Sequence, residues 1–229
     1  MSRVKSFKVR GGTDINGYKV RECLGRGWEG EVYRVAEEFS GASRVLKLFD
    51  PHQYRSKHML QYCPKLEKLS NVSGVIRYYH GGWWERHDCY YLVMESLDGK
   101  PLDQVVSRRS LPLFQALRVI RDLLRIVRDC HDLHCCVGDI HSGNIILSTA
   151  GHPCIIDVDL GSKLTTRTAS TDRVAVCKLF YELTDGPYAA DLRHTLPKRA
   201  DALATKYKST SEVLRALDTL LGHNTHESA

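Results

Sequence analysis

The chain has 229 residues, of which 42% are hydrophobic and 26% are charged, and its net charge is +6. This length suits one large domain or two small lobes, and the composition is ordinary for a soluble globular protein. No apolar run approaches the ~20 residues that span a bilayer, and residues 1–7 lack the hydrophobic stretch of a secretory signal. We therefore expect a cytoplasmic protein with no membrane span.

Neither the basic residues nor the cysteines indicate a specialised ligand. Nucleic-acid binding favours concentrated positive charge interleaved with aromatic residues. The densest basic stripe has helical spacing and is interpreted as a solvated helix face, so no nucleic-acid partner is expected. It consists of Arg118, Arg121, Arg125 and Arg128. The eight cysteines form no Cys-x-x-Cys pair, and buried free thiols in a reducing cytosol are the favoured interpretation.

The N-terminal half reads as a series of short strands. Residues 1–17 are basic and contain Gly11-Gly12, so we expect a mobile tail there. A helical piece is expected between Ser56 and Leu69, where Pro64 interrupts it or starts a new turn. Aromatic and β-branched runs bounded by glycine or polar turns predict five strands. These are Tyr18–Leu24, Glu31–Ala36, Ser43–Phe49, Val75–Tyr79 and Cys89–Glu95.

After residues 97–101 the character of the chain becomes helical. The amphipathic pattern predicts helices over Leu113–Asp132, Val174–Leu183 and Ser211–Leu221, the last with capping residues from Ser209 to Ser211. Two β-like stretches, Ile145–Leu147 and Cys154–Ile156, separate the first two helices. We therefore expect an α+β chain with a β-rich lobe over residues 18–97, a helical lobe over residues 98–222, and a C-terminal tail over residues 223–229.

A glycine motif and a lysine follow one another in the strand-rich half. Leu24-Gly-Arg-Gly-Trp-Glu-Gly-Glu-Val32 is a Gly-x-Gly-x-x-Gly-x-Val pattern between two predicted strands. Glycines allow a hairpin backbone to approach phosphates closely, and a dinucleotide-binding glycine motif would instead lead from a strand into a helix. Fifteen residues later, Lys47 stands between apolar neighbours on a predicted central strand. Together they favour a buried lysine that binds phosphates over a lysine that simply faces solvent.

The catalytic candidates lie between the two longer helices of the second half. Asp139 and Asn144 stand five apart in Val137-Gly-Asp-Ile-His-Ser-Gly-Asn144, and Asp157 follows after an apolar run. One carboxylate in this layout can take a proton from an attacking hydroxyl. The asparagine and the second carboxylate can hold a metal that carries phosphates. The layout therefore predicts a phosphoryl-transfer enzyme.

In order and spacing, these motifs resemble the eukaryotic-like protein kinase superfamily, over roughly Tyr18 to Leu221. The resemblance implies a bilobal protein-kinase-like fold with a β-rich N-lobe and a reduced helical C-lobe, and it implies ATP and Mg²⁺ as cofactors. By motif, Asp139 matches the catalytic base, Asn144 and Asp157 the metal ligands, and Lys47 the phosphate-binding lysine. Glu67 is assigned as the carboxylate that pairs with Lys47.

The resemblance also implies an ATP site. Met94 matches the gatekeeper, and Glu95 and Leu97 match the hinge positions whose backbone meets adenine. The residues implied in cofactor binding are Leu24, Gly25, Gly27, Gly30, Val32, Val45, Lys47, Met94, Glu95, Leu97 and Ile146. His131 matches the end of the helix before the catalytic loop, and Asp172 resembles the aspartate that braces this loop.

Four features depart from the common kinase pattern. Gly138 replaces the arginine that usually precedes the base and contacts a phosphorylated activation loop, which argues against that form of switching. His141 replaces the usual lysine, as in Gly-Asp-Leu-His-Pro-Gly-Asn of aminoglycoside and choline kinases. Asp159 follows two residues after Asp157, so the motif can be aligned in two registers. Asp159 is then either a second metal ligand or a carboxylate that braces the loop. Finally, residues 158–171 lack Ala-Pro-Glu and are too short for a conventional peptide-docking segment.

The sequence thus predicts an ATP- and Mg²⁺-dependent phosphotransferase, with a serine/threonine protein kinase as the first interpretation. A small-molecule or lipopolysaccharide kinase is the alternative, because of His141 and the short segment. A pseudokinase that only binds nucleotide is the second alternative. The acceptor is a protein or small-molecule hydroxyl. The basic segment Asp185–Lys208 indicates an acidic acceptor unless it is only a solvated connection.

Overall fold

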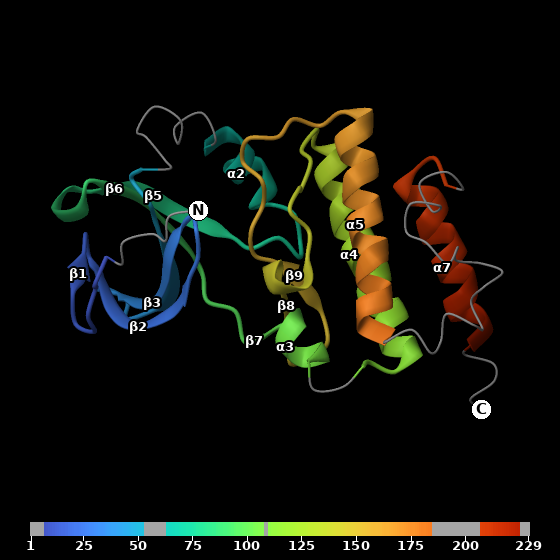
Figure 1. The fold of residues 1–229 in the computed structure, drawn as a ribbon, viewed down its shortest axis with the longest axis horizontal. Coiled ribbons are helices and arrows are strands. Elements are labelled where there is room, and N and C mark those ends of the chain that lie inside the picture. The colour runs from blue at the N-terminus through green and yellow to red at the C-terminus, as the bar shows by residue number, and fades with distance from the viewer. Residues whose placement is uncertain (1–6, 53–62, 108–109, 185–206, 225–229) are drawn as a thin grey trace. The chain divides into compact units, whose positions relative to one another are not determined.

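The computed structural model describes residues 7–52, 63–107, 110–184 and 207–224 (Figure 1). The chain divides into two compact units. One consists of Met1–Ser70 and Ile76–Leu97, and the other of Asn71–Val75 and Asp98–Ala229. The chain passes between the units at Leu97 and Asp98, where the linker was expected from the change in sequence character.

The first unit is built on a six-stranded antiparallel sheet with the order β1-β2-β3-β4-β6-β5. The strands are β1 (Asp14–Ile15), β2 (Tyr18–Arg26), β3 (Gly30–Glu37), β4 (Ser43–Phe49), β5 (Tyr78–Trp84) and β6 (Cys89–Glu95). A short 3₁₀ helix, η1 (Glu85–His87), joins β5 to β6, and helix α2 spans Cys63–Leu69. The predicted bounds of β4 and β6 are confirmed to the residue.

Alternate side chains of β3 and β4 are buried in the core of this unit. Tyr33 and Val35 on β3 and Leu46 and Leu48 on β4 have no exposed surface. Successive side chains of a strand point to opposite faces, so Lys47 lies on the other face from Leu46 and Leu48. Because β4 pairs with β3 on one side and β6 on the other, the backbone around Lys47 is fixed from both sides.

Two parts of this unit differ from the sequence expectation. Residues 7–17 are not a loose extension, because Phe7 and Ile15 are buried in the core of the sheet and β1 pairs with β2. The strand expected at Val75–Tyr79 instead runs over Tyr78–Trp84 and includes Gly81-Gly82. A Cβ at Gly82 would lie 2.6 Å from Tyr91 Oη. Gly82 therefore does not mark the end of a strand but allows the Tyr91 side chain to pack closely against β5.

In its described residues, the second unit contains four α-helices and a small sheet. The helices are α3 (Leu102–Val106), α4 (Leu113–Asp132), α5 (Thr166–Thr184) and α7 (Thr210–Asn224). The antiparallel sheet has the order β7-β8-β9 and consists of β7 (Gly99–Pro101), β8 (Ile145–Ser148) and β9 (Pro153–Ile155). Helix α4 packs against both α5 and α7, as the ribbon shows (Figure 1). Among the described residues, no helix is long and apolar enough to cross a membrane.

The helix predictions for this unit hold with one large change of bounds. Helix α4 has the predicted limits, and its apolar stripe, including Leu117, Leu124 and Val127, is buried. Helix α5 begins at Thr166, well before the predicted Val174. Its first turns lack an apolar stripe and are held by polar caps, since Thr165 N–H donates to Thr168 Oγ1 and Thr168 N–H donates to Thr165 Oγ1.

Candidate active site

The glycine motif forms the hairpin between β2 and β3. The Gly27 amide donates to the Gly30 carbonyl at 2.9 Å, which closes the turn and leaves Trp28 at its exposed tip. Gly30 is required by the protein itself, because its φ is +153° and a Cβ would meet the Leu48 carbonyl oxygen at 1.8 Å. A Cβ on Gly25 or Gly27 would meet nothing within 4 Å. The protein's own packing therefore does not require glycine at those two positions.

Lys47 on β4 forms an ion pair with this hairpin. Its Nζ lies 2.5 Å from Oε2 of Glu29, and the Lys47 and Glu29 side chains are only 12% and 26% exposed. The Asp50 amide donates to the Glu29 carbonyl at 2.8 Å, which ties the end of β4 to the same residue. Sequence reasoning missed Glu29 as a partner of Lys47, although a carboxylate between two glycines of the hairpin was a visible signal.

Glu67, the carboxylate that we assigned to Lys47, lies on α2 and is exposed. Its pairing with Lys47 stays a prediction. In this structure the Lys47 ammonium group contacts Glu29.

The remaining cofactor-binding candidates of this unit come from neighbouring strands. Leu24 lies on β2, Val32 on β3, Val45 on β4, and Met94 and Glu95 on β6; Leu97 follows β6. Val45 is the register partner of Met94, which is buried, whereas Leu24 is 43% exposed. The Glu95 side chain accepts a hydrogen bond from the Arg77 amide at 2.8 Å. The contact of these residues with adenine stays a prediction, as does that of Ile146 on β8 in the other unit.

In the second unit, a buried carboxylate organises the catalytic loop. Asp172 of α5 is 2% exposed and accepts hydrogen bonds from the Val137 and Gly138 amides, both at 2.9 Å. His131 Nε2, at the end of α4, lies 2.9 Å from Asp172 Oδ2. One carboxylate thus joins two helices to the two residues that precede Asp139, as the resemblance implies.

Asp139 is presented to solvent in an unusual backbone conformation. Its φ is +44°, its side chain is 68% exposed, and Asn144 Nδ2 donates to both its carbonyl and its Oδ2 at 3.1 Å. His141 Nδ1 accepts a hydrogen bond from the Gly143 amide at 3.1 Å, and its Nε2 lies 3.8 Å from Asp139 Oδ2. The structure therefore brings together Asp139, Asn144 and His141 on one short loop that includes the 3₁₀ turn η2 (Ser142–Asn144).

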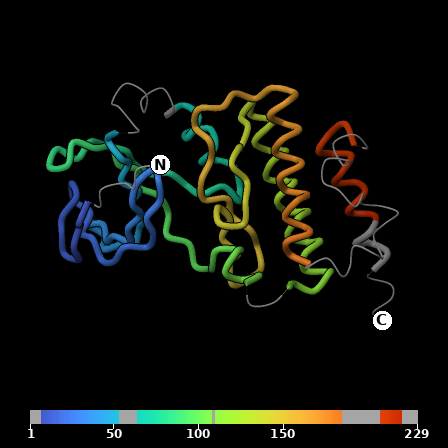
Figure 2. Tube along the Cα trace, in the orientation of Figure 1, coloured from blue at the N-terminus to red at the C-terminus, as the bar shows by residue number. Residues whose placement is uncertain are grey.

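Two aspartates follow β9 and have different surroundings. Asp157 is partly exposed and comes directly after Ile156, whose amide donates to the Asn144 carbonyl at 3.0 Å. Asp159 donates its own amide to the Val137 carbonyl at 2.9 Å, and its carboxylate accepts hydrogen bonds from Gly161 and Ser162. The segment after β9 therefore runs beside the catalytic loop (Figure 2).

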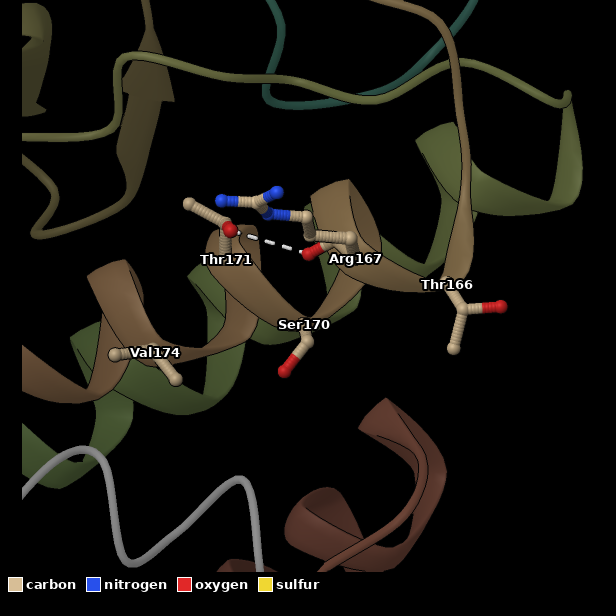
Figure 3. Close-up of a pocket in the computed structure, with 5 residues that line it drawn as sticks. All are labelled: Thr166, Arg167, Ser170, Thr171 and Val174. Carbon is tan, nitrogen blue, oxygen red and sulfur yellow. Dashed lines mark hydrogen bonds between the residues drawn. The ribbon is translucent and has the colours of Figure 1, made fainter.

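A separate cavity of about 570 Å³ lies along the first turns of α5. Figure 3 shows its lining of hydroxyl groups with one guanidinium and one apolar side chain, from Thr166, Arg167, Ser170, Thr171 and Val174. Thr171 Oγ1 donates to the Arg167 carbonyl at 3.1 Å. The basic segment Asp185–Lys208, predicted as an acceptor platform, lies outside the described residues except for Tyr207 and Lys208.

Comparison with known proteins agrees with these motifs. The protein kinase domain family matches residues 18–181. The probable serine/threonine-protein kinase YbdM of Bacillus subtilis (strain 168) is 28% identical over 170 residues, which cover 72% of this chain and 66% of YbdM. The membrane-associated tyrosine- and threonine-specific cdc2-inhibitory kinase of Drosophila melanogaster is 30% identical over 148 residues, or 59% of this chain and 27% of that protein.

A solved structure supports the same fold. The kinase domain of Mycobacterium tuberculosis PknI superimposes with a TM-score of 0.75 at 17% identity, and the match covers 93% of this chain and 99% of that domain. The chain thus spans only part of the length of its curated relatives but nearly all of a solved kinase domain. It belongs to the protein kinase domain family, a family of phosphotransferases, and has the kinase fold with a β-sheet N-terminal lobe and a helical C-terminal lobe.

Proposed function

We propose that this protein is an ATP- and Mg²⁺-dependent phosphotransferase, and specifically a serine/threonine protein kinase. The observation that carries the proposal is the loop that holds Asp139 beside Asn144 while Asp172 fixes its backbone. Such a loop presents a carboxylate with a fixed orientation and an exposed face, which is what a group that accepts a proton from a hydroxyl requires.

The nucleotide-binding groups of the first unit fit a triphosphate. Open space at Gly25 and Gly27 lets backbone amides of the hairpin approach phosphate oxygens without a side chain between them. Strand pairing on both sides of β4 fixes the backbone of Lys47. Its ammonium group, which lies against the Glu29 carboxylate, is a cation of the kind that binds phosphate. Val45 and the buried Met94 add apolar surface for a purine.

The residues assigned to Mg²⁺ also fit that ion. Asn144 uses its amide nitrogen within the loop, so its side-chain oxygen is the atom that remains for a cation. An amide oxygen and the Asp157 carboxylate are hard oxygen ligands of the kind that Mg²⁺ prefers. Mg²⁺ is commonly bound through one or two carboxylates together with substrate phosphates and water. When bound, this ion would neutralise phosphate charge.

Asp139 is the proposed base. Its carboxylate receives a hydrogen bond from Asn144, lies near His141 Nε2 and is largely exposed, so it can orient an acceptor hydroxyl and take its proton. The rate enhancement would come from positioning and charge neutralisation rather than from a covalent intermediate.

The first interpretation and the alternative differ in the acceptor of the phosphoryl group. The kinase name of YbdM supports a protein acceptor. A small-molecule or lipopolysaccharide acceptor is favoured by His141 near Asp139, and by helix α5, which begins at Thr166 and leaves residues 158–165 as the whole connection from Asp157. The charge of Asp185–Lys208 supports an acidic acceptor in either case.

One experiment separates these functions. Purified protein is incubated with γ-labelled ATP and Mg²⁺, alone and with protein or metabolite extracts, and the D139N variant serves as the matched control. Label on protein supports the kinase proposal, and label only on small molecules supports the alternative. Nucleotide binding without any transferred label, in both the protein and its control, would show a nucleotide-binding pseudokinase and contradict the proposal.

A further inference from the structure

Asp159 is the centre of a hydrogen-bond cluster that joins the segment after Asp157 to the catalytic loop. Its backbone amide donates to the Val137 carbonyl at 2.9 Å. Its Oδ1 accepts from the Gly161 amide at 2.8 Å and from the Ser162 amide at 3.3 Å, and its Oδ2 accepts from the Ser162 hydroxyl. The backbone bond attaches Asp159 to the loop, and the carboxylate turns the chain that follows.

Gly138 and Asp159 approach each other so closely that a side chain at position 138 would collide with Asp159. Gly138 has a φ of +66°, and a Cβ at this position would lie 2.6 Å from the Cβ of Asp159. Any larger residue at 138 would be strained by its backbone and would displace Asp159. The position of Asp159 therefore requires glycine at position 138.

Further hydrogen bonds hold the rest of the segment. The Cys136 thiol donates to the Ser162 carbonyl at 3.2 Å, which is a second link from the catalytic loop. At the next residue, Thr168 Oγ1 donates to the Lys163 carbonyl at 2.9 Å. Besides the backbone bond of Asp159, two unmodified side chains thus attach the segment at Ser162 and Lys163.

We propose that Asp159 is a positioning residue, which holds Asp157 in place by fixing the segment after it against the catalytic loop. Asp159 acts through hydrogen bonds to the protein and does not bind the metal. The inference rests on the proposed function for its kinetic consequences, but the brace itself is a structural property that can be tested without turnover.

The test compares two substitutions that differ in one chemical property. Asp159→Asn retains a side-chain oxygen for the Gly161 and Ser162 amides, whereas Asp159→Ala removes it. We expect Asp159→Asn to keep kcat within about threefold, with an unchanged Mg²⁺ requirement. Asp159→Ala should lower kcat by about tenfold to 100-fold, with little change in KM for ATP, because misplacement alone costs that much. Asp132→Asn, an exposed carboxylate at the end of α4, is the control for loss of charge.

The results distinguish the brace from a metal ligand. If Asp159→Asn loses activity as severely as Asp159→Ala and needs more Mg²⁺, Asp159 binds the ion and the proposal is wrong. Full activity of Asp159→Ala would also overturn it. Hydrogen exchange of the Gly161 and Ser162 amides gives a readout that does not need activity. These amides should exchange faster in Asp159→Ala than in Asp159→Asn, even if the protein transfers no phosphate; equal exchange in both variants would contradict the brace.

The contact with Gly138 provides a second test. Gly138→Ala should lower kcat because its Cβ displaces Asp159. Asp159→Gly removes both the brace and the obstructing Cβ, so the double variant should be about as active as Asp159→Gly alone. Multiplied losses in the double variant would show that the two residues act independently and would overturn the coupling.

Discussion

The two units hold their functional groups in different ways. In the first unit, Lys47 forms an ion pair with Glu29, a residue of the glycine hairpin. In the second, the backbone before Asp139 is held by the buried carboxylate of Asp172, and Asn144 contacts Asp139 directly. An ion pair between partly exposed side chains can change its partner, whereas a buried carboxylate that accepts several hydrogen bonds has no comparable replacement.

Under the proposed function, the fold fixes the position of Asp139 in the second unit, whereas ATP competes with Glu29 for Lys47 in the first. Substitutions of the residues that hold Asp139 should therefore change turnover with little effect on nucleotide affinity. Substitutions at the Lys47–Glu29 pair should change nucleotide affinity.

Asp139→Asn should lower kcat by about 100- to 10,000-fold, the range expected for loss of a general base. Asparagine tolerates the left-handed backbone of residue 139 better than alanine does, so the substitution removes basicity with little added strain. Nucleotide affinity, measured by calorimetry, should remain within about threefold. Turnover at the original rate would contradict the assignment of the base, and a large loss of ATP affinity would contradict the separation between the units.

Asp157→Asn should cost about 1,000-fold in kcat, because a metal ligand contributes several kcal/mol to stabilising charge in the transition state. Raising the Mg²⁺ concentration should recover part of the activity, and chelation by EDTA should abolish the activity of the original protein. The Mg²⁺ titration is the measurement. If Asp159→Asn were more damaging than Asp157→Asn in the same titration, the chosen register would be wrong.

Asp172→Ala should destabilise the second unit and lower activity together. The Val137 and Gly138 amides would lose their acceptor, and leaving a buried donor without one costs about 1–3 kcal/mol. We expect a lower Tm in thermal unfolding and a kcat reduced by about 100-fold through misplacement of Asp139. Asp129→Ala, which removes a half-exposed carboxylate near the end of α4, is the matched control. Loss of Tm with normal turnover in the surviving folded protein would show that Asp172 stabilises the fold without positioning the loop.

Much of the fold could be predicted from the sequence where one strong pattern determined an element. Strands β4 and β6 and helix α4 have the predicted bounds because each is a continuous apolar or amphipathic run between clear turns. Strand β5 was misplaced because Gly81-Gly82 suggests a break, and only the approach of Tyr91 shows why glycine stands there. The start of α5 was missed because polar caps rather than periodicity stabilise its first turns.

For the candidate site, the motif identified residues but not all of their contacts. The spacing of Asp139 and Asn144 predicted that they act together, and the structure shows them hydrogen-bonded. Glu29 was visible as a carboxylate between two glycines of the motif, but its pairing with Lys47 depends on how the hairpin bends over β4, which the sequence does not report. The role of Asp159 was open for the same reason, because the close approach of its Cβ to Gly138 follows from a backbone angle that the sequence does not report.

Glu29→Gln should raise nucleotide affinity. Under the proposed function, the Glu29 carboxylate competes with ATP for Lys47. Because the pair is partly exposed, its ion-pair interaction contributes about 1 kcal/mol or less, and the substitution removes this contribution. We therefore expect the Kd for ATP, measured by calorimetry, to fall by about threefold to fivefold, with kcat little changed. Glu22→Gln, which removes an exposed carboxylate paired with Arg34 in the same sheet, should leave the Kd unchanged. Weaker ATP binding by Glu29→Gln would show that Glu29 supports the nucleotide instead of competing with it.

The smallest effect should come from removing phosphate groups. Thr165 and Thr168 lie at the start of α5, and their unmodified hydroxyls cap the helix, while that of Thr168 also binds the Lys163 carbonyl. Because Gly138 offers no arginine to bind a phosphorylated residue, phosphatase treatment should change kcat by less than about twofold, within the spread expected for a surface change. Thr168→Glu, which places a charge where the hydroxyl donates, should instead lower activity, whereas Thr166→Glu, at an exposed position beside it, should not. Loss of most of the activity on phosphatase treatment, with removal of phosphate as the only change in mass, would contradict this prediction. It would show that a bound phosphate group, and not folding alone, holds this segment in place.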